Sequence, residues 1–189
     1  MKRLNLMLAC AALIGAALPA SPCSRVTYLA ADSTEVIVGR TLDWRTPIPT
    51  NLYVYPAGME KKSMPEGPCY NWVSKYGSVL AVSYDGGATE GMNNQGLVMN
   101  GLFCKTSVYR TDKTAPKGTP VMSLSVIVSY FLDNFASVEE AYTWMKNNDF
   151  AISGQTFDGG TVSLLHWALT DSTGDTMVIE YDGGEVKLY

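Results

Sequence analysis

The sequence predicts an α+β fold in which helices pack on β-sheets. Predicted strands occupy the first and last parts of the chain, and two predicted helices lie between them instead of alternating with strands as in βαβ units. The chain has 189 residues, of which 47% are hydrophobic. That length and composition predict one domain, or a large part of one, with a substantial buried core.

The first 22 residues are left out of this fold because they resemble a secretory signal peptide with a short pro-segment. Lys2 and Arg3 precede an apolar stretch over residues 4–18, and Pro-Ala-Ser follows at residues 19–21. The stretch is shorter than the roughly 20 residues of a membrane span. No later segment is a candidate span. We therefore expect an exported protein, periplasmic or secreted, whose domain begins at Cys23.

The residues after Cys23 predict a β-hairpin and then three more strands. Residues 24–30 and 35–40 are rich in β-formers, and a turn-like Ala-Asp-Ser-Thr segment separates them. Further strands are predicted at residues 51–55, 78–84 and 96–103. The last of these is almost continuously apolar, which predicts burial on both faces.

Three connecting segments lack a strand or helix pattern. Residues 57–70 and 105–116 predict surface loops, and residues 91–96 predict a turn. Lys61 and Lys62 form the longest basic cluster, and we expect both to be solvated. The net charge is −4, and no basic patch suggests a binder of nucleic acid or of an anionic membrane.

The rest of the chain predicts two helices and three closing strands. The helices are expected over residues 121–134 and 137–147. The second begins with a capping box, because Ser137 is followed three residues later by Glu140. Residues 150–160 predict a loop. The closing strands are expected at residues 163–171, 176–181 and 185–189.

Cys23 is a candidate nucleophile at the N-terminus of the processed chain. Pro22 makes the bond before Cys23 a poor site for ordinary signal cleavage. We therefore expect Ser21 and Pro22 to be removed later, and Cys23 itself could attack the preceding carbonyl. The thiol would then be the nucleophile, and the free α-amine, with an unperturbed pKa of roughly 7.7–8.0, would be the general base. Such chemistry needs no catalytic histidine, and the single histidine, His166, fits that.

Other interpretations of the cysteines stay open. Cys23 could carry a lipid, as in a surface lipoprotein, although small residues are wanted directly before such a cysteine. It could also be inert or half of a disulfide. Cys69 and Cys104 are the other cysteines of the processed chain, and with three in an oxidising compartment at least one stays unpaired. The lack of a Cys-x-x-Cys motif and the single histidine argue against a zinc site.

Arg40 and Asp43 are candidate partners of Cys23. Both lie in the segment GRTLDW, residues 39–44, at the end of the predicted hairpin, which can return close to Cys23. Arg40 would lower the pKa of the thiol through its charge. Asp43 would accept hydrogen bonds from the α-ammonium group. The alternative is an ordinary surface Arg–Asp pair.

Motifs in order along the chain carry a family resemblance. They are Cys-Ser-Arg from Cys23, GRTLDW at 39–44, NWVSKYGSV at 71–79, GMNNQGL at 91–97, LDNFASVEEA at 132–141 and LHWALTD at 165–171. Together they resemble the choloylglycine hydrolase family of N-terminal-nucleophile hydrolases, which includes bile salt hydrolases and penicillin V acylases. The resemblance spans the chain from Cys23 onward and is strongest to exported Gram-negative members.

The resemblance implies an αββα sandwich and hydrolysis of linear amides without a metal or organic cofactor. It assigns catalytic roles to Cys23, Arg40 and Asp43. Some family members place an oxyanion-hole Asn or Tyr at the position of Phe103, whose side chain cannot donate a hydrogen bond. Only the backbone N–H of Phe103 could serve here. Trp44 and Tyr53 are candidates for lining an acyl pocket, while aromatic residues on strands more often belong to the core.

Two further active-site residues of the family, an Asn in an Asn-x-x-Pro-like segment and a later Arg, would lie beyond Tyr189. Residues 23–189 are therefore expected to be the N-terminal part of a single domain, an incomplete sandwich. The first hypothesis is a hydrolase acting on a small-molecule N-acyl amide: a conjugated bile acid, penicillin V or an N-acyl homoserine lactone. Alternatives are an inactive surface or binding protein and an acyltransferase using the same cysteine. A homo-oligomer stays open for the full-length form.

Two polar residues are expected to be structural. His166 lies in an apolar strand pattern and is expected to be buried and hydrogen-bonded. Asn93 and Asn94 lie in the predicted turn, where Asn is favoured for backbone reasons.

Overall fold

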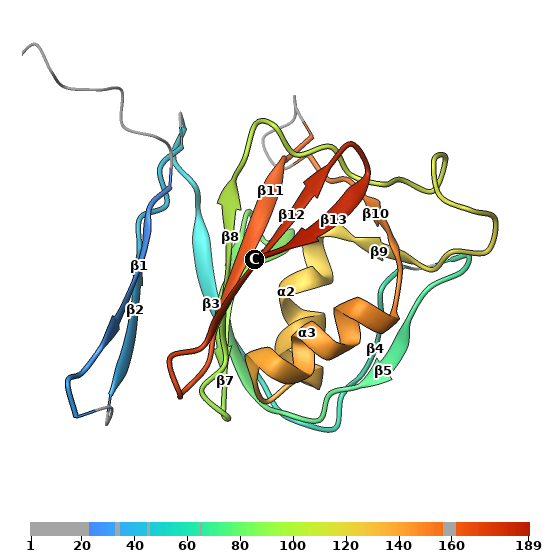
Figure 1. Ribbon diagram of the computed structural model, residues 1–189. Helices are drawn as coiled ribbons and strands as arrows, with labels where there is room; N and C mark the ends of the chain where they lie inside the picture. Colours follow the sequence, from blue (N-terminus) through green and yellow to red (C-terminus); the bar gives the residue numbers. More distant parts are fainter. Residues whose placement is uncertain (1–22, 33–34, 45, 65, 157–161) are drawn as a thin grey trace, which may run out of the picture.

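Three layers build the molecule: a two-stranded hairpin, a seven-stranded sheet and a layer of two α-helices (Figure 1). The structure is a computed structural model that describes residues 23–32, 35–44, 46–64, 66–156 and 162–189. The predicted leader, residues 1–22, lies outside the described residues. This arrangement confirms the predicted α+β class.

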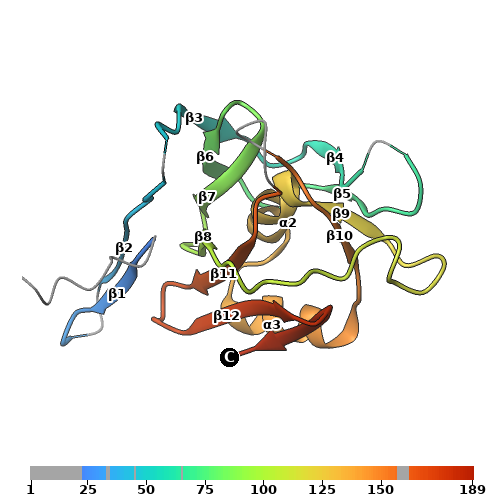
Figure 2. The ribbon, with the colours of Figure 1, turned by 90° about the horizontal axis from the view of Figure 1, so that it is seen from above.

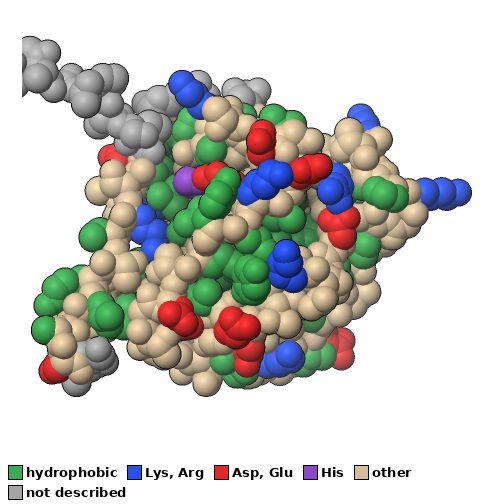
Figure 3. Space-filling view, viewed as in Figure 1, with side chains coloured by type: hydrophobic (Ala, Val, Ile, Leu, Met, Phe, Trp, Pro, Cys, Tyr) green, Lys and Arg blue, Asp and Glu red, His purple; other side chains and the backbone are tan. Residues whose placement is uncertain are grey.

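The hairpin consists of β1 (Arg25–Leu29) and β2 (Val36–Arg40), paired antiparallel as predicted. It lies on the face of the large sheet that is opposite the helices, and Figures 1 and 2 show this from two directions. Its outward side chains Val26, Tyr28 and Ile37 are exposed, and Figure 3 shows hydrophobic side chains gathered on it. Such apolar side chains are typical of a protein core, but on this face no layer of the described residues covers them.

The seven-stranded sheet is antiparallel throughout. Its order is β13-β12-β11-β8-β7-β6-β3. The bounds are β3 (Thr50–Tyr55), β6 (Ser78–Ser83), β7 (Gly87–Asn93), β8 (Val98–Phe103), β11 (Leu165–Thr170), β12 (Thr176–Asp182) and β13 (Glu185–Leu188). Six of these strands were predicted within one or two residues of each end, and the predicted double-sided burial of β8 is confirmed.

Strand β7 corrects the sequence prediction, which placed a turn over residues 91–96. The strand runs through Asn93, and the turn is shorter, because Gly96 N–H donates to the Asn93 carbonyl at 3.1 Å. Gly96 does lie in the turn, with a φ of 85°, whereas Gly91 has a packing role. A Cβ at Gly91 would lie 2.5 Å from Leu80 Cδ2 and 3.0 Å from Leu132 Cδ1, so only glycine lets the helix layer approach this strand closely.

The first helix begins later than predicted. Residues Val121–Ser123 form β9, which pairs in parallel with β10 (Ala151–Ser153) inside the predicted loop 150–160. A 3₁₀ turn, η1 (Leu124–Val126), precedes α2 (Ile127–Asn134). The Ser123 side chain caps the 3₁₀ turn by accepting from Ser125 N–H, so helical structure cannot extend back through it.

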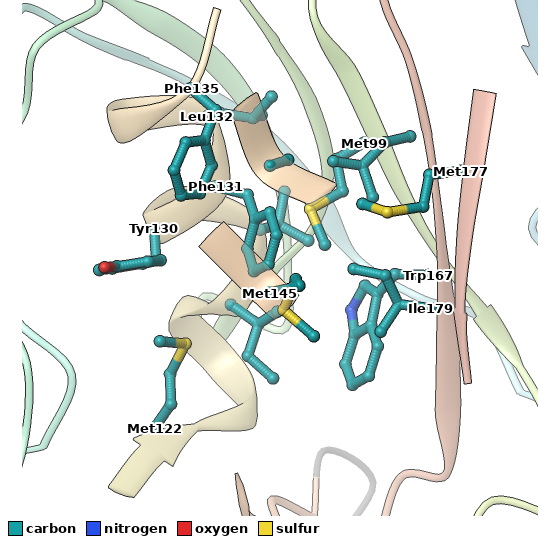
Figure 4. Close-up of a cluster of buried hydrophobic side chains, with 14 of the residues drawn as sticks. Met99, Met122, Tyr130, Phe131, Leu132, Phe135, Met145, Trp167, Met177 and Ile179 are labelled. Carbon is teal, nitrogen blue, oxygen red and sulfur yellow. The ribbon is translucent and has the colours of Figure 1, made fainter. Parts of the chain in front are cut away.

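The second helix, α3 (Val138–Asn147), begins as its capping box predicted. Glu140 N–H donates to Ser137 Oγ at 3.2 Å, and the Glu140 carboxylate accepts from Ala136 N–H at 2.8 Å. The core lies between the two helices and the sheet (Figure 4). There Phe131 of α2 and Trp167 of β11 are almost completely buried.

The predicted loop 57–70 contains a strand. Its β4 (Glu60–Lys62) pairs with β5 (Asn71–Val73). Lys61 is not solvated as predicted, because its Nζ lies 2.9 Å from Asp133 Oδ2, and the Asp133 side chain is 0% exposed. The same carboxylate oxygen accepts from Trp72 Nε1 at 2.7 Å. This network ties the β4–β5 hairpin to α2.

The sheet face opposite the helices is only partly covered by the β1–β2 hairpin. On the neighbouring strands β3, β6 and β7, Val54, Val79 and Met92 are paired in one row, and they are 77%, 42% and 52% exposed. Leu52 on the same face is 75% exposed. Within the described part of the chain, no helix is long and apolar enough to cross a membrane.

Candidate active site

Cys23 lies at the open end of the hairpin, two residues before the start of β1 at Arg25. Thr41 N–H donates to the Ser24 carbonyl at 2.9 Å, which extends the β1–β2 pairing and holds Cys23 beside the segment that contains Asp43. The Cys23 thiol donates to the Asp43 carbonyl oxygen at 3.9 Å. The hairpin therefore brings two of the predicted site residues together, through the backbone of Asp43.

The Asp43 carboxylate is fixed by its own neighbours. Thr41 Oγ donates to Asp43 Oδ2 at 2.6 Å, and Ser24 N–H donates to Thr41 Oγ at 3.0 Å. These bonds link the carboxylate to the backbone next to Cys23. Its predicted contact with the α-ammonium group of a processed Cys23 stays a prediction.

A small pocket, with a cavity volume of about 70 Å³, opens beside Cys23. Its walls are mainly apolar and include Leu42, Trp44, Ile48, Phe103 and Leu165. Such a cavity suits an apolar group of a small molecule.

The pocket exists because two strands of the sheet separate at this end. The β7–β8 ladder ends at the pair Glu90–Asn100, although β8 continues to Phe103 and β7 begins at Gly87. The register of β6 and β7 shifts at the same level, and Thr89 becomes the extra residue of a β-bulge. Thr89 and Phe103 both line the pocket.

The predicted pocket residues fall into two places. Trp44 contacts Phe103 in an edge-to-face arrangement with ring centroids 5.1 Å apart, and both line the pocket. Tyr53 is not among the residues that line this pocket. It stacks on Tyr55 at the sheet edge, and its hydroxyl donates to Asp85 Oδ1 at 3.1 Å. That bond raises the pKa of Tyr53.

Arg40 extends from the hairpin into the gap between β7 and β8. Its side chain is only 7% exposed, and its Nε lies 3.0 Å from Glu90 Oε2. Its Nη2 donates to the carbonyl of Gly101, a residue that also lines the pocket. Both Nε and Nη1 are buried and have no hydrogen-bond partner among the described residues, so the contact with Glu90 is an ion pair without a hydrogen bond. Arg40 thus brings a positive charge and unused donors to the pocket region.

Sequence reasoning missed three polar residues beside Arg40. Arg25 Nε donates to Asn100 Oδ1 at 2.8 Å, and Asn100 Nδ2 donates to Glu90 Oε2 at 3.0 Å. Burial lowers the pKa of Arg25. The only sequence signal for Glu90 was a lone acid in an otherwise uncharged stretch, and that stretch was not recognised as a strand.

The remaining candidates have structural partners. His166 Nδ1 lies 2.9 Å from Glu180 Oε1, and the His166 side chain is 26% exposed, so it is hydrogen-bonded but less buried than expected. The three cysteines of the described residues, Cys23, Cys69 and Cys104, are free. In the described ranges no group of three or more His, Cys, Asp or Glu is placed to hold a metal ion.

Comparison with known proteins gives a family and a fold. Residues 23–189 match the model of the linear amide C–N hydrolases, choloylglycine hydrolase family. The chain is 35% identical over 173 residues to a penicillin V acylase of Pectobacterium atrosepticum, covering 87% of this chain and 46% of that protein.

Solved structures agree with this match. The structure of penicillin V acylase from Agrobacterium tumefaciens superposes with a TM-score of 0.76 at 37% identity, covering 87% of this chain and 48% of that one. A mutant of conjugated bile acid hydrolase from Clostridium perfringens shares the fold, with a TM-score of 0.70 at 20% identity, covering 88% and 50%. The chain thus spans about half the length of these proteins.

Proposed function

Because this chain belongs to the choloylglycine hydrolase family of linear amide C–N hydrolases, we propose that it cleaves small N-acyl amides with Cys23 as an N-terminal nucleophile. The observation that carries the proposal is the position of the Cys23 thiol at an apolar pocket in the gap between β7 and β8. Because the relatives at 35% and 37% identity are penicillin V acylases, an aryloxyacetyl amide such as penicillin V is the first candidate substrate. Conjugated bile acids are the second.

The proposed reaction has two halves. Cys23 Sγ attacks the amide carbonyl while its proton passes to the free α-amine, and a tetrahedral oxyanion forms. The intermediate collapses to a thioester, and the α-ammonium group returns the proton to the leaving amine. Water, deprotonated by the same α-amine, then attacks the thioester and releases the carboxylic acid and the thiol. Every proton moves between substrate, water and Cys23.

The backbone of β8 supports an oxyanion site at Phe103. Backbone groups of successive strand residues point to opposite neighbours. Cys104 N–H donates to Leu164 on the β11 side, so the N–H of Phe103 points to the side that β7 has left. Gly101, two residues earlier, directs its carbonyl to that side, where it accepts from Arg40. A substrate oxyanion at the pocket would meet the Phe103 donor.

Export and processing belong to the same proposal. The leader-like residues 1–22 would direct the chain out of the cytoplasm, and their removal would free the α-amine of Cys23. The backbone of Cys23 supports this step, because its φ of 64° lies in the left-handed region that L-residues rarely adopt. Cleavage before Cys23 leaves an amine with no preceding carbonyl, which removes the constraint on this torsion.

Two alternatives use the same residues differently. A catalytically inactive surface or binding protein would hold a ligand at the same pocket without turnover. An acyltransferase would form the same thioester but pass the acyl group to an amine instead of water. Adding an acceptor amine and looking for a new amide tests the acyltransferase.

Amide hydrolysis by the secreted chain tests the proposal. The purified protein is incubated with penicillin V and with glycine- and taurine-conjugated bile acids, and the released amine is measured. We expect turnover that Cys23→Ala abolishes and Cys104→Ala, which removes another free and partly exposed thiol, retains. Turnover that survives Cys23→Ala would refute the nucleophile. No turnover in the wild type would favour the binding protein.

A further inference from the structure

Polar side chains connect the hairpin that carries Cys23 to the large sheet. Its apolar residues Val26, Tyr28 and Ile37 point outward and are 64%, 58% and 55% exposed. Leu29 faces the turn at Gly174, where a Cβ on that glycine would lie 3.4 Å from it. Val36 and Val38 of β2 are half-buried, so the position of the hairpin depends on specific polar contacts in addition to a limited apolar contact.

Those contacts form one connected set, which we call the clamp: Arg25, Arg40, Glu90 and Asn100. Glu90 Oε2 is its centre, because the same oxygen lies 3.0 Å from Arg40 Nε and accepts from Asn100 Nδ2 at 3.0 Å. Asn100 in turn accepts from Arg25 Nε at 2.8 Å. The clamp therefore joins both strands of the hairpin to β7 and β8, the two strands that border the pocket.

Charge makes Glu90 the decisive member. Arg25 and Arg40 are direct partners across β1 and β2, an arrangement in which like charges repel. Arg40 is buried and Glu90 is the carboxylate that faces it, while Arg25 is held by the neutral side chains of Asn100 and Thr170. Without Glu90, two partly or fully buried guanidinium groups would face each other without a counter-charge, which burial makes costly.

We propose that Glu90 is a positioning residue that holds Arg40 and, through the clamp, sets the position of Cys23 against the pocket. The inference rests on the proposed function in taking Cys23 as the nucleophile. Glu90 lies on the sheet side of Arg40, whereas Cys23 lies at the open end of the hairpin, and Glu90 is not among the residues that line the pocket. Its effect on the reaction is therefore transmitted through Arg40 and the hairpin.

Two variants of Glu90 separate loss of the clamp from partial rescue. Glu90→Ala removes the counter-charge of Arg40 and the acceptor of Asn100, so we expect kcat to fall about a hundredfold while KM changes less than about threefold. A displacement near 1 Å can cost that much. Glu90→Gln keeps an acceptor oxygen without the charge and should lie between Glu90→Ala and the wild type. In both, exchange of the backbone amides of residues 24–29 and 36–41 should accelerate, by about tenfold in Glu90→Ala.

Asp133→Asn is the matched control, because it weakens another buried carboxylate paired with a basic residue, far from the hairpin along the chain. We expect Asp133→Asn to lower Tm. At a temperature below the Tm of both proteins, its kcat and the amide exchange of its hairpin should equal those of the wild type. Equal losses of kcat in Asp133→Asn and Glu90→Ala would show general destabilisation and overturn the proposal.

Hydrogen exchange and alkylation separate this proposal from the proposed function. If the wild-type chain shows no Cys23-dependent turnover, the proposed function fails, and Glu90 is then judged on hairpin exchange and on the rate at which iodoacetamide alkylates Cys23. Faster hairpin exchange together with an altered alkylation rate in Glu90→Ala supports positioning. Wild-type hairpin exchange in Glu90→Ala contradicts it, whatever the activity.

Discussion

Arg25 and Arg40 stand directly opposite each other across the β1–β2 hairpin, and both guanidinium groups enter the sheet face that the helices leave uncovered. Their partners differ. Arg25 meets neutral acceptors on Asn100 and Thr170, whereas Arg40 meets the Glu90 carboxylate and the carbonyl of Gly101 at the pocket. Arg25 anchors the β1–β2 hairpin to the sheet, and Arg40 connects the hairpin to the pocket.

Arg40→Lys should lower kcat/KM by about tenfold or more, because an ammonium group cannot reproduce the planar fork that reaches both a carboxylate and a backbone carbonyl. Steady-state hydrolysis of penicillin V measures this. Arg110→Lys is the control, since Arg110 also binds a carboxylate, Asp149, and a carbonyl, Gly184, outside the pocket lining. Wild-type kinetics in Arg40→Lys would show that the guanidinium geometry is not used.

Trp44→Ala should raise KM for aromatic acyl substrates by about tenfold, because the ring lines the pocket and packs edge-to-face on Phe103 there. Trp44→Phe keeps an aromatic edge and should lose less. Comparing KM for aryloxyacetyl and short aliphatic acyl amides checks the cause. An equal rise for both substrate classes would argue against ring contact with the acyl group.

Asn93→Ala should lower the free energy of unfolding by about 2–4 kcal/mol, because it leaves buried backbone groups on both sides without their hydrogen-bond partner. Asn93 Nδ2 donates to the carbonyls of Leu132 and Phe135 at 2.9 and 2.8 Å, and its Oδ1 accepts from two backbone N–H groups of the turn. Urea denaturation measures the change. Asn94→Ala, at the exposed neighbour, should be nearly neutral, and equal losses in the two variants would contradict this account.

Asp171→Asn should cost about 1–2 kcal/mol at pH 7, because charged hydrogen bonds to the start of α3 and to the neighbouring turn are lost. Burial alone would raise the pKa of Asp171, but hydrogen bonds from Thr173 and Val138 outweigh it and hold the pKa below its ordinary value of 3.8. The contribution of the Asp171 carboxylate to the free energy of unfolding is therefore complete above pH 3.8. It disappears as the pH falls through the lower pKa of the folded state.

Unfolding of both proteins over a pH series checks this sign. The difference between wild type and Asp171→Asn should be constant near neutrality and shrink below about pH 3.8. Asp175→Asn, at an exposed acid of the same turn, should change stability by less than about 0.5 kcal/mol. A difference that grows on acidification would contradict the role given to Asp171.

Local patterns predicted the parts of the fold that local physics decides. The β1–β2 hairpin and the capping box of α3 follow from turn residues and a cap that lie within a few positions of each other. The start of α2 was predicted too early, because β9 is held extended by pairing with β10, about thirty residues later, and by hydrogen bonds to the carbonyls of Pro68 and Ser63. Strand β7 was missed because glycine and polar residues there serve close packing and the pocket.

The site divides in the same way. Cys23 and Asp43 could be associated from sequence because one hairpin carries both. Glu90 and Asn100 could not be associated with the site from sequence. Their contact with the β1–β2 hairpin depends on the sheet register and on where the hairpin lies. The pocket depends on where the β7–β8 ladder ends, which no short motif encodes.

The central claim is that Cys23, as the first residue of the mature chain, forms an acyl-enzyme. Its most direct test is peptide-resolved mass spectrometry of the secreted protein, quenched in acid during turnover of penicillin V. We predict an N-terminal peptide that begins at Cys23 and carries the acyl group as a hydroxylamine-labile thioester. A lipid on Cys23, a chain that retains Ser21 and Pro22, or an acyl group on another residue would contradict the account.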